Sequence, residues 1–212
     1  MQLTKHGHAC VALSDGERRL VVDPGSYTAD DAWAGASALL VTHEHADHFV
    51  PGKVRAALDA DPALELWTNA SVAGQVTGLG SRVHVVGPGD TFTAAGFEVS
   101  VHGEWHAVVH PDIPRVRNVG FLVEGTVFHP GDALTLPEVA VPTLLLPAHA
   151  PWSKLGELVD YLRELRAERA FAVHDAMLSE IGLGTVAGLL GERGPGQPTP
   201  CTRLAPGESV EL

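Results

Sequence analysis

The chain has 212 residues, of which 45% are hydrophobic and 19% charged, a balance typical of a globular protein and not of a disordered one. Its net charge of −12 disfavours long-range attraction to phosphate polymers, so we expect no nucleic-acid partner. Only two cysteines occur, Cys10 and Cys201, and the first residues form no apolar signal core, so we expect a cytoplasmic protein without a disulfide framework or a membrane segment. The length suits one domain spanning residues 1–212.

The first half of the chain is predicted to consist mainly of strands. Two apolar runs separated by the turn-forming residues 14–17 indicate a hairpin, and the continuous apolar run 38–42 is typical of a strand buried on both faces. Pro51 lies near the start of an amphipathic stretch and predicts a helix. The expected strands are residues 10–13, 19–22, 38–42, 64–67, 83–86 and 97–101, and the expected helices are residues 51–60 and 70–77.

The second half of the chain repeats this plan. Apolar residues recur at helical spacing in residues 154–166 and predict a helix that covers a sheet, whereas three glycines weaken the helix expected at residues 178–190. The expected strands are residues 119–123, 126–129, 143–146 and 170–173, followed by a Pro/Gly loop at residues 194–200 and a last pair of strands. Strands grouped in each half with interleaved helices predict two sheets packed together with helices outside.

Histidine carries the strongest chemical signal. Twelve histidines occur beside only 14 lysines and arginines, and imidazole is the commonest metal ligand in proteins. Three of them and an aspartate fall within six residues, directly after the expected strand 38–42: His43, His45, Asp47 and His48. In an extended segment His43 and His45 point to the same side, and a turn after them would direct Asp47 and His48 toward a second centre. The pattern predicts two adjacent metal sites, with ligands that suit zinc.

This cluster, His43-x-His45-x-Asp47-His48, resembles the signature of the metallo-β-lactamase superfamily. Further along the chain, the sequence is similar to that superfamily at four other motifs, which contain Asp23, His106, Asp132 and His174. The compact length, Gly7-His8 and Asn118-x-Gly120 look most similar to the UlaG-like metal-dependent hydrolases. The resemblance implies an α/β (α+β) fold, a four-layer αββα sandwich of two mixed β-sheets flanked by helices.

The resemblance also implies a role for each matching residue. His43, His45 and His106 would hold one divalent metal ion, Asp47, His48 and His174 would hold a second, and Asp132 would bridge them. Zn²⁺ is the expected metal, with Mn²⁺ or Fe²⁺ as alternatives. A hydroxide between the metals would be the nucleophile, because metal binding brings the pKa of water toward about 7. Asp47 would also move the proton, and Asp23 would fix an imidazole or the loop that carries the cluster.

Several histidines have more than one interpretation. His110 lies four residues after His106 and competes with it for the third position in the first metal site; we favour His106, and His110 then becomes a residue that contacts substrate or supports a ligand. His149 follows an expected strand end, where it would either donate to a developing oxyanion or pack under Trp152. His8, Asn118 and His129 are expected beside the site, where they would support the ligands or contact substrate. Asp175 is expected to cap the following helix.

The resulting prediction is a dinuclear metal-dependent hydrolase that acts on a small lactone, ester or phosphodiester. Two alternatives stay open: a di-iron or mono-iron redox protein of the same fold, and a non-catalytic metal-binding or ligand-sensing domain. The expected partner is a small-molecule substrate. The sequence does not fix the substrate, the metal or the oligomeric state.

Overall fold

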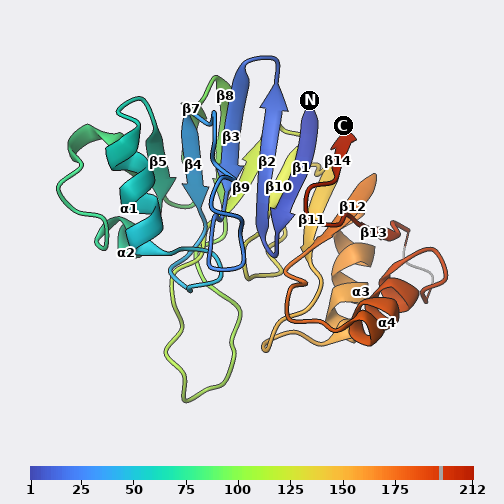
Figure 1. Cartoon of the computed structure of the whole chain (residues 1–212). Helices are drawn as coiled ribbons and strands as arrows, with labels where there is room; N and C mark the ends of the chain where they lie inside the picture. The colour runs from blue at the N-terminus through green and yellow to red at the C-terminus, as the bar shows by residue number, and fades with distance from the viewer. Residues whose placement is uncertain (196–197) are drawn as a thin grey trace.

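The computed structural model describes residues 1–195 and 198–212, and these form two seven-stranded sheets packed face to face (Figure 1). The first sheet has the strand order β14-β1-β2-β3-β4-β5-β6, and the second has the order β13-β12-β11-β10-β9-β8-β7. The strands of the first sheet are β1 (Gln2–Gly7), β2 (Cys10–Asp15), β3 (Arg18–Val22), β4 (Ala38–Val41), β5 (Glu65–Thr68), β6 (Val83–Val85) and β14 (Ser209–Glu211). Those of the second are β7 (Thr91–Ala94), β8 (Phe97–His102), β9 (Gly120–Val123), β10 (Val127–His129), β11 (Thr143–Pro147), β12 (Arg169–Val173) and β13 (Cys201–Arg203).

Helices cover the outer face of each sheet. The first sheet carries α1 (Pro51–Ala60) and α2 (Ala70–Ala73), with a short 3₁₀ helix at Gly80–Arg82, and the second carries α3 (Leu155–Leu165) and α4 (Glu180–Leu190) (Figure 1). None of the helices among the described residues has the length and apolar character needed to cross a membrane.

Three apolar layers hold these elements together. Between the sheets, side chains such as Leu40 of β4 pack with Phe121 of β9 and Val173 of β12. On the outer faces, α1 packs on the first sheet through residues such as Leu58, and α3 packs on the second through residues such as Leu162. Each layer excludes apolar surface from water. The arrangement is the expected four-layer αββα sandwich of two mixed sheets.

The structure differs from the predicted elements at several places. The sequence pattern missed β1, where the buried Lys5 interrupts the apolar alternation, and the edge strand β7. The helix expected at residues 70–77 ends at Ala73. The last two strands do not pair with each other, because β13 joins the second sheet and β14 the first. The loop expected at residues 194–200 includes residues 196–197, which lie outside the described part of the chain.

Strand direction brings the chemically important segments to one edge. In the first sheet β3 runs parallel to β4, and the turn between β1 and β2 lies beside the carboxyl end of β3. In the second sheet β10, β11 and β12 are parallel, and β8 ends beside the start of β9 and the end of β10. The backbones of the two sheets meet there, since His174 N–H donates to the His8 carbonyl (3.0 Å) and Val119 N–H to the Thr42 carbonyl (3.0 Å). Loops that follow these strand ends therefore converge on a common site.

Candidate metal centre

The histidine cluster that follows β4 is anchored by a single buried carboxylate. Asp23, which follows β3, accepts from the Thr42 N–H (2.8 Å), the Thr42 hydroxyl (2.7 Å) and the His48 Nδ1–H (2.7 Å). Its side chain is fully buried, and its backbone has a φ of 51°. Asp23 thus fixes both ends of the segment that carries the cluster.

Potential metal ligands gather in three overlapping groups among the described residues. Within each group one ligand atom per residue lies within 4.8 Å of the others. The groups are His43, His45 and His106; His8, Asp47, His48 and His174; and His43, His48 and Asp132. All seven residues predicted as ligands are therefore brought together, although they come from four separate segments of the chain.

Asp132 lies between the groups. Its Oδ1 is 3.1 Å from His48 Nε2, and its Oδ2 is 3.4 Å from His106 Nε2 and 3.2 Å from His174 Nε2. Asp47 Oδ2 lies 3.2 Å from the same His174 nitrogen. The Asp132 carboxylate therefore faces imidazoles of each of the other two groups.

The protonation pattern of four imidazoles fits a metal site. In each ring the Nδ1–H has an oxygen acceptor, which leaves Nε2 with a free lone pair when the ring is neutral. The four pairs are His43 with the Thr42 hydroxyl (3.0 Å), His48 with Asp23 (2.7 Å), His106 with the Ala107 carbonyl (2.6 Å) and His174 with the His149 carbonyl (2.6 Å). All four Nε2 atoms are buried, and within the described residues none makes a well-oriented hydrogen bond, although the carboxylates of Asp47 and Asp132 lie close to three of them. Buried polar atoms are rarely left unpartnered, so the donor set fits divalent metal ions.

The carboxylates favour positive charge at this point. Burial opposes ionisation of Asp132 and Asp47, but the surrounding imidazoles hold the pKa of both carboxyls well below the ordinary value. Burial likewise lowers the pKa of His174, yet Asp132 and Asp47 outweigh it and raise that pKa to about 9. The space between Nε2 and the carboxylates thus attracts a cation, whether a proton or a metal ion.

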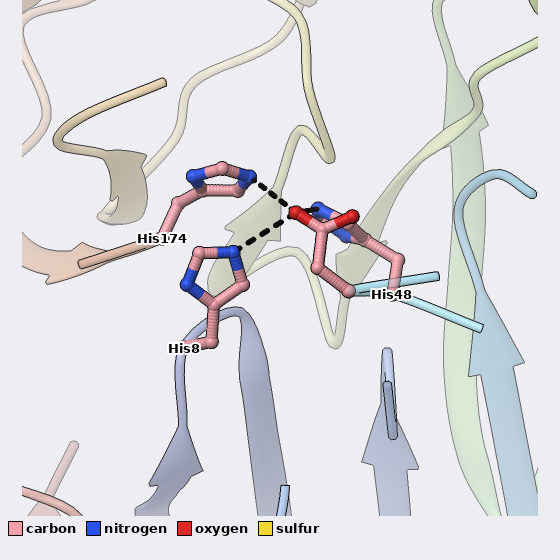
Figure 2. Close-up of side chains that lie close together, drawn as sticks. His8, His48 and His174 are labelled. Carbon is pink, nitrogen blue, oxygen red and sulfur yellow. Dashed lines mark hydrogen bonds and ion pairs between the residues drawn. The ribbon is translucent and has the colours of Figure 1, made fainter. Parts of the chain in front are cut away.

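His8 contacts the centre but presents a proton to it. Its Nδ1 accepts from the Ala176 N–H (3.2 Å), so in the neutral ring the proton is on Nε2 and is donated to Asp47 Oδ2 (3.1 Å). Figure 2 shows His8, His48 and His174 converging from separate segments of the chain. Although His8 belongs to the second group of potential ligands, in this tautomer its Nε2–H supports Asp47.

Asn118 and His129 shape the turn that carries Asp132. Asn118 Oδ1 accepts from the Asp132 N–H (3.0 Å), and its Nδ2 donates to the Pro130 carbonyl (2.9 Å). His129 Nε2–H donates to the Ala9 carbonyl (2.8 Å), and its Nδ1 accepts from the Gly131 N–H (3.1 Å). Gly131 has a φ of 64°, and a Cβ there would lie 2.2 Å from Asn118 Oδ1, so the turn requires glycine.

The two competing histidines of the third motif are placed differently. His106 is buried, and its Nε2 faces the centre. His110 is exposed, its Nδ1 accepts from the Asp112 N–H (3.2 Å), and it belongs to none of the potential ligand groups in the described chain. The side chain of His149 is half-buried and also lies outside those groups; its carbonyl oxygen holds the ring of His174. A catalytic role for the His149 side chain stays a prediction.

Two features of the site were missed or misjudged at the level of sequence. Trp152 donates its indole N–H to Asp132 Oδ2 (2.8 Å), a bond that no spacing pattern reveals. Asp175 does not cap α4; Ser179 does, by accepting from the Gly182 N–H. Asp175 instead pairs with the buried Lys5 (2.8 Å) and with Arg203 (2.8 Å), because buried charges need partners. These ion pairs secure the residue that follows His174.

Comparisons with known proteins agree with this geometry. A family model described as a beta-lactamase superfamily domain matches residues 2–174. Protein Rv0786c of Mycobacterium tuberculosis is 38% identical over 91% of this chain and 92% of its own, and a UPF0173 metal-dependent hydrolase of Xanthobacter autotrophicus is 25% identical over 71% of this chain and 68% of its own.

Solved structures share the fold at lower identity. The metallo hydrolase Igni18 of Ignicoccus hospitalis superposes with a TM-score of 0.73 at 16% identity, over 99% of this chain and 97% of its own. CmlA, a diiron β-hydroxylase of Streptomyces venezuelae, superposes with a TM-score of 0.64 at 16% identity, over 100% of this chain and 54% of its own. The family match, the two seven-stranded sheets and the His/Asp centre together show that this chain belongs to the metallo-β-lactamase superfamily.

Proposed function

We propose that this protein is a dinuclear metal-dependent hydrolase. The observation that carries the proposal is the set of four buried imidazole Nε2 atoms, each with a free lone pair when its ring is neutral, arranged around the carboxylates of Asp47 and Asp132. In the assignment that the geometry supports, His43, His45 and His106 would hold one ion, Asp47, His48 and His174 would hold the other, and Asp132 would contact both. Two divalent ions, when bound, supply an acidified water as nucleophile and polarise the substrate oxygen that gains charge.

The residues of the chain supply orientation and proton transfer. His8 donates to Asp47 and holds that carboxylate toward the centre. In the proposed reaction Asp47 would accept a proton from the attacking water and return it to the leaving oxygen. Trp152 and Asn118 hold the side chain and the backbone of Asp132. With these groups already fixed by hydrogen bonds, little reorganisation is needed during the reaction.

A small lactone, ester or phosphodiester is the proposed substrate class, since each contains an acyl or phosphoryl oxygen that two cations can polarise. Zn²⁺ is the proposed metal because imidazole and carboxylate ligands in this ratio suit it, with Mn²⁺ and Fe²⁺ as alternatives. A single domain, a cytoplasmic location and similarity to the UlaG-like branch are part of the same proposal. The acidic net charge supports the absence of a nucleic-acid partner.

A di-iron redox function is the second candidate, because the diiron β-hydroxylase CmlA has the same fold. The imidazole-rich ligand set of this chain supports hydrolysis over oxygen chemistry. A mono-iron protein or a non-catalytic sensor would need fewer of the seven ligands than are gathered here.

Metal analysis combined with a substrate screen tests the proposal. The purified protein is stripped, reloaded separately with Zn²⁺, Mn²⁺ and Fe²⁺, and assayed on lactones, aryl esters and bis(4-nitrophenyl) phosphate. We expect two ions per chain and turnover without oxygen. One iron per chain with oxygen-dependent turnover would overturn the hydrolase assignment.

An Asp132→Ala variant tests the bridge. We expect it to lose metal occupancy and activity together, because the bridging carboxylate is removed and buried imidazoles are left facing one another. Unchanged metal content with full activity would show that Asp132 does not bridge.

A further inference from the structure

A cavity of about 570 Å³ opens beside the metal centre. One wall is formed by the long segment that follows β8, yellow-green in Figure 1, which projects beyond the sheets, and the other wall by the segment that leads into α3. Trp152 joins the cavity to the centre, since its indole donates to Asp132 and its ring lies 6.1 Å from the ring of His106. The volume is in the range of small-molecule sites.

The cavity is lined by polar and charged side chains and, between them, by exposed apolar and aromatic ones. Trp105, Val108 and Val109 line it and are 38%, 56% and 37% exposed. The guanidinium of Arg117 lies 3.9 Å from the centroid of the Trp105 ring, a contact that orients the indole. Two tryptophans in one open cavity next to a reactive centre offer flat surfaces for a planar or apolar group.

The charge of the cavity is carried by Arg115. Lys154 and Glu157 also line it, but they lie 3.3 Å apart and largely neutralise each other. Arg115 gives one of its N–H donors to the His106 carbonyl, and within the described chain no carboxylate lies within 4.0 Å of its guanidinium. An arginine keeps its charge at any physiological pH and has further donors to offer. Its uncompensated charge is notable in a protein with a net charge of −12.

We propose that this cavity binds a flat apolar group that carries an anion, and that Arg115 contacts the anion. The substrate of the hydrolase would then be a small ester, lactone or phosphodiester with an aromatic or alkyl body and a separate carboxylate, sulfonate or phosphate group. Calling this ligand a substrate rests on the proposed hydrolase function. The preference of the cavity for an anionic ligand does not depend on turnover.

Equilibrium binding of two matched probes to the metal-loaded protein tests the proposal. Naphthalene-2-sulfonate carries an anion that is a poor metal ligand, and 2-(methylsulfonyl)naphthalene is its neutral counterpart. Binding is followed by tryptophan fluorescence and calorimetry at low salt. We expect the sulfonate to bind about fivefold more tightly than the sulfone, the upper range for one partly exposed charge pair, and the preference to weaken at high salt.

Three variants locate the preference. Arg115→Gln should remove most of it while leaving the affinity for the sulfone unchanged, and Arg115→Lys should retain part of it because the charge is kept. Lys53→Gln removes an exposed cation that pairs with Asp30, on a helix that covers the first sheet, and should leave the preference intact.

The outcomes separate the two proposals. Equal affinity for both probes, no binding of either, or a preference untouched by Arg115→Gln would overturn the inference about the cavity. A protein that prefers the sulfonate through Arg115 but hydrolyses none of the screened substrates would retain this inference and count against the hydrolase.

Discussion

Single hydrogen bonds decide how firmly the Asp132 carboxylate is held. Trp152 and Trp105 both line the cavity beside the centre, but only Trp152 donates to Asp132. We expect Trp152→Phe to weaken metal binding by about 10- to 100-fold, the range typical when a partner of a metal ligand is lost. An aromatic ring is kept although it is smaller, so the indole N–H is judged by comparison with the same change at Trp105.

Trp105→Phe is the matched control and should bind metal like the unmodified protein. Competition with a chromophoric chelator measures both affinities, and the spectrum of the cobalt-substituted protein reports the ligand geometry. Equal metal affinity in the two variants would show that the Trp152 bond does not position Asp132.

The choice between His106 and His110 is also made at the level of one residue. His106 Nε2 is buried and faces His43 and His45, whereas His110 is exposed. We expect His106→Ala to lose about one metal ion per chain and His110→Ala to keep both, as measured by elemental analysis. Metal loss in His110→Ala alone would reverse the assignment.

At the scale of elements, the segment that follows β3 packs against the backbone of the histidine cluster. A Cβ on Gly25 would lie 1.9 Å from the Asp47 carbonyl oxygen and 2.5 Å from the His48 nitrogen, so any side chain there must displace this backbone. We expect Gly25→Ala to lower stability by about 1–3 kcal/mol, the usual cost of overpacking. It should also reduce the occupancy of the site formed by Asp47 and His48.

Gly188→Ala is expected to raise stability, in contrast to Gly25→Ala. Gly188 lies inside α4, and a Cβ there would meet nothing within 4 Å in the part of the chain that the structure describes. Because glycine costs a helix interior about 0.5–1 kcal/mol relative to alanine, this variant should gain that much stability and keep its metal content. Chemical denaturation measures the free energy of unfolding of both variants.

A Gly25→Ala protein with unchanged stability and metal content would contradict the close approach between Gly25 and the backbone of Asp47 and His48.

At the scale of the whole molecule, the metal centre joins the two sheets. Its ligands follow strands of both, with His43 after β4 of the first sheet and His174 after β12 of the second. A ligand that binds only the folded state stabilises it by about 2.7 kcal/mol at a hundredfold excess over its dissociation constant. We therefore expect chelation to lower the melting temperature by roughly 5–10 °C, given the usual dependence for a chain of this size.

Calorimetry with and without chelator measures this shift, and added Zn²⁺ should restore the original melting temperature. Asp132→Ala, with its weakened centre, should show a smaller shift on chelation. A melting temperature unaffected by chelation in the unmodified protein would mean that no structural metal is bound between the sheets.

The amino-acid sequence by itself determined the identity of the potential ligands and most of the secondary structure. The density of histidine and aspartate at residues 43–48 is a local property, as is the continuous apolar run of β4, whose four residues are all buried. Local patterns failed where a long-range partner overrides them. Lys5 can be buried in β1 because its ammonium group pairs with Asp175 and donates to the Ala172 carbonyl. Asp175 therefore serves as an ion-pair partner and not as a helix cap.

Only the tertiary structure decided which atoms face one another. Spacing could not choose between His106 and His110, because the choice depends on where the chain crosses the sheet edge. Nor could it reveal that Trp152 donates to Asp132, or that the proton of His8 points at Asp47, since these contacts join residues 20 and 39 positions apart. A metal centre built from strand ends requires the two sheets to be packed together first. The sequence therefore identifies the potential ligands, whereas the packing of the two sheets determines how those ligands are arranged.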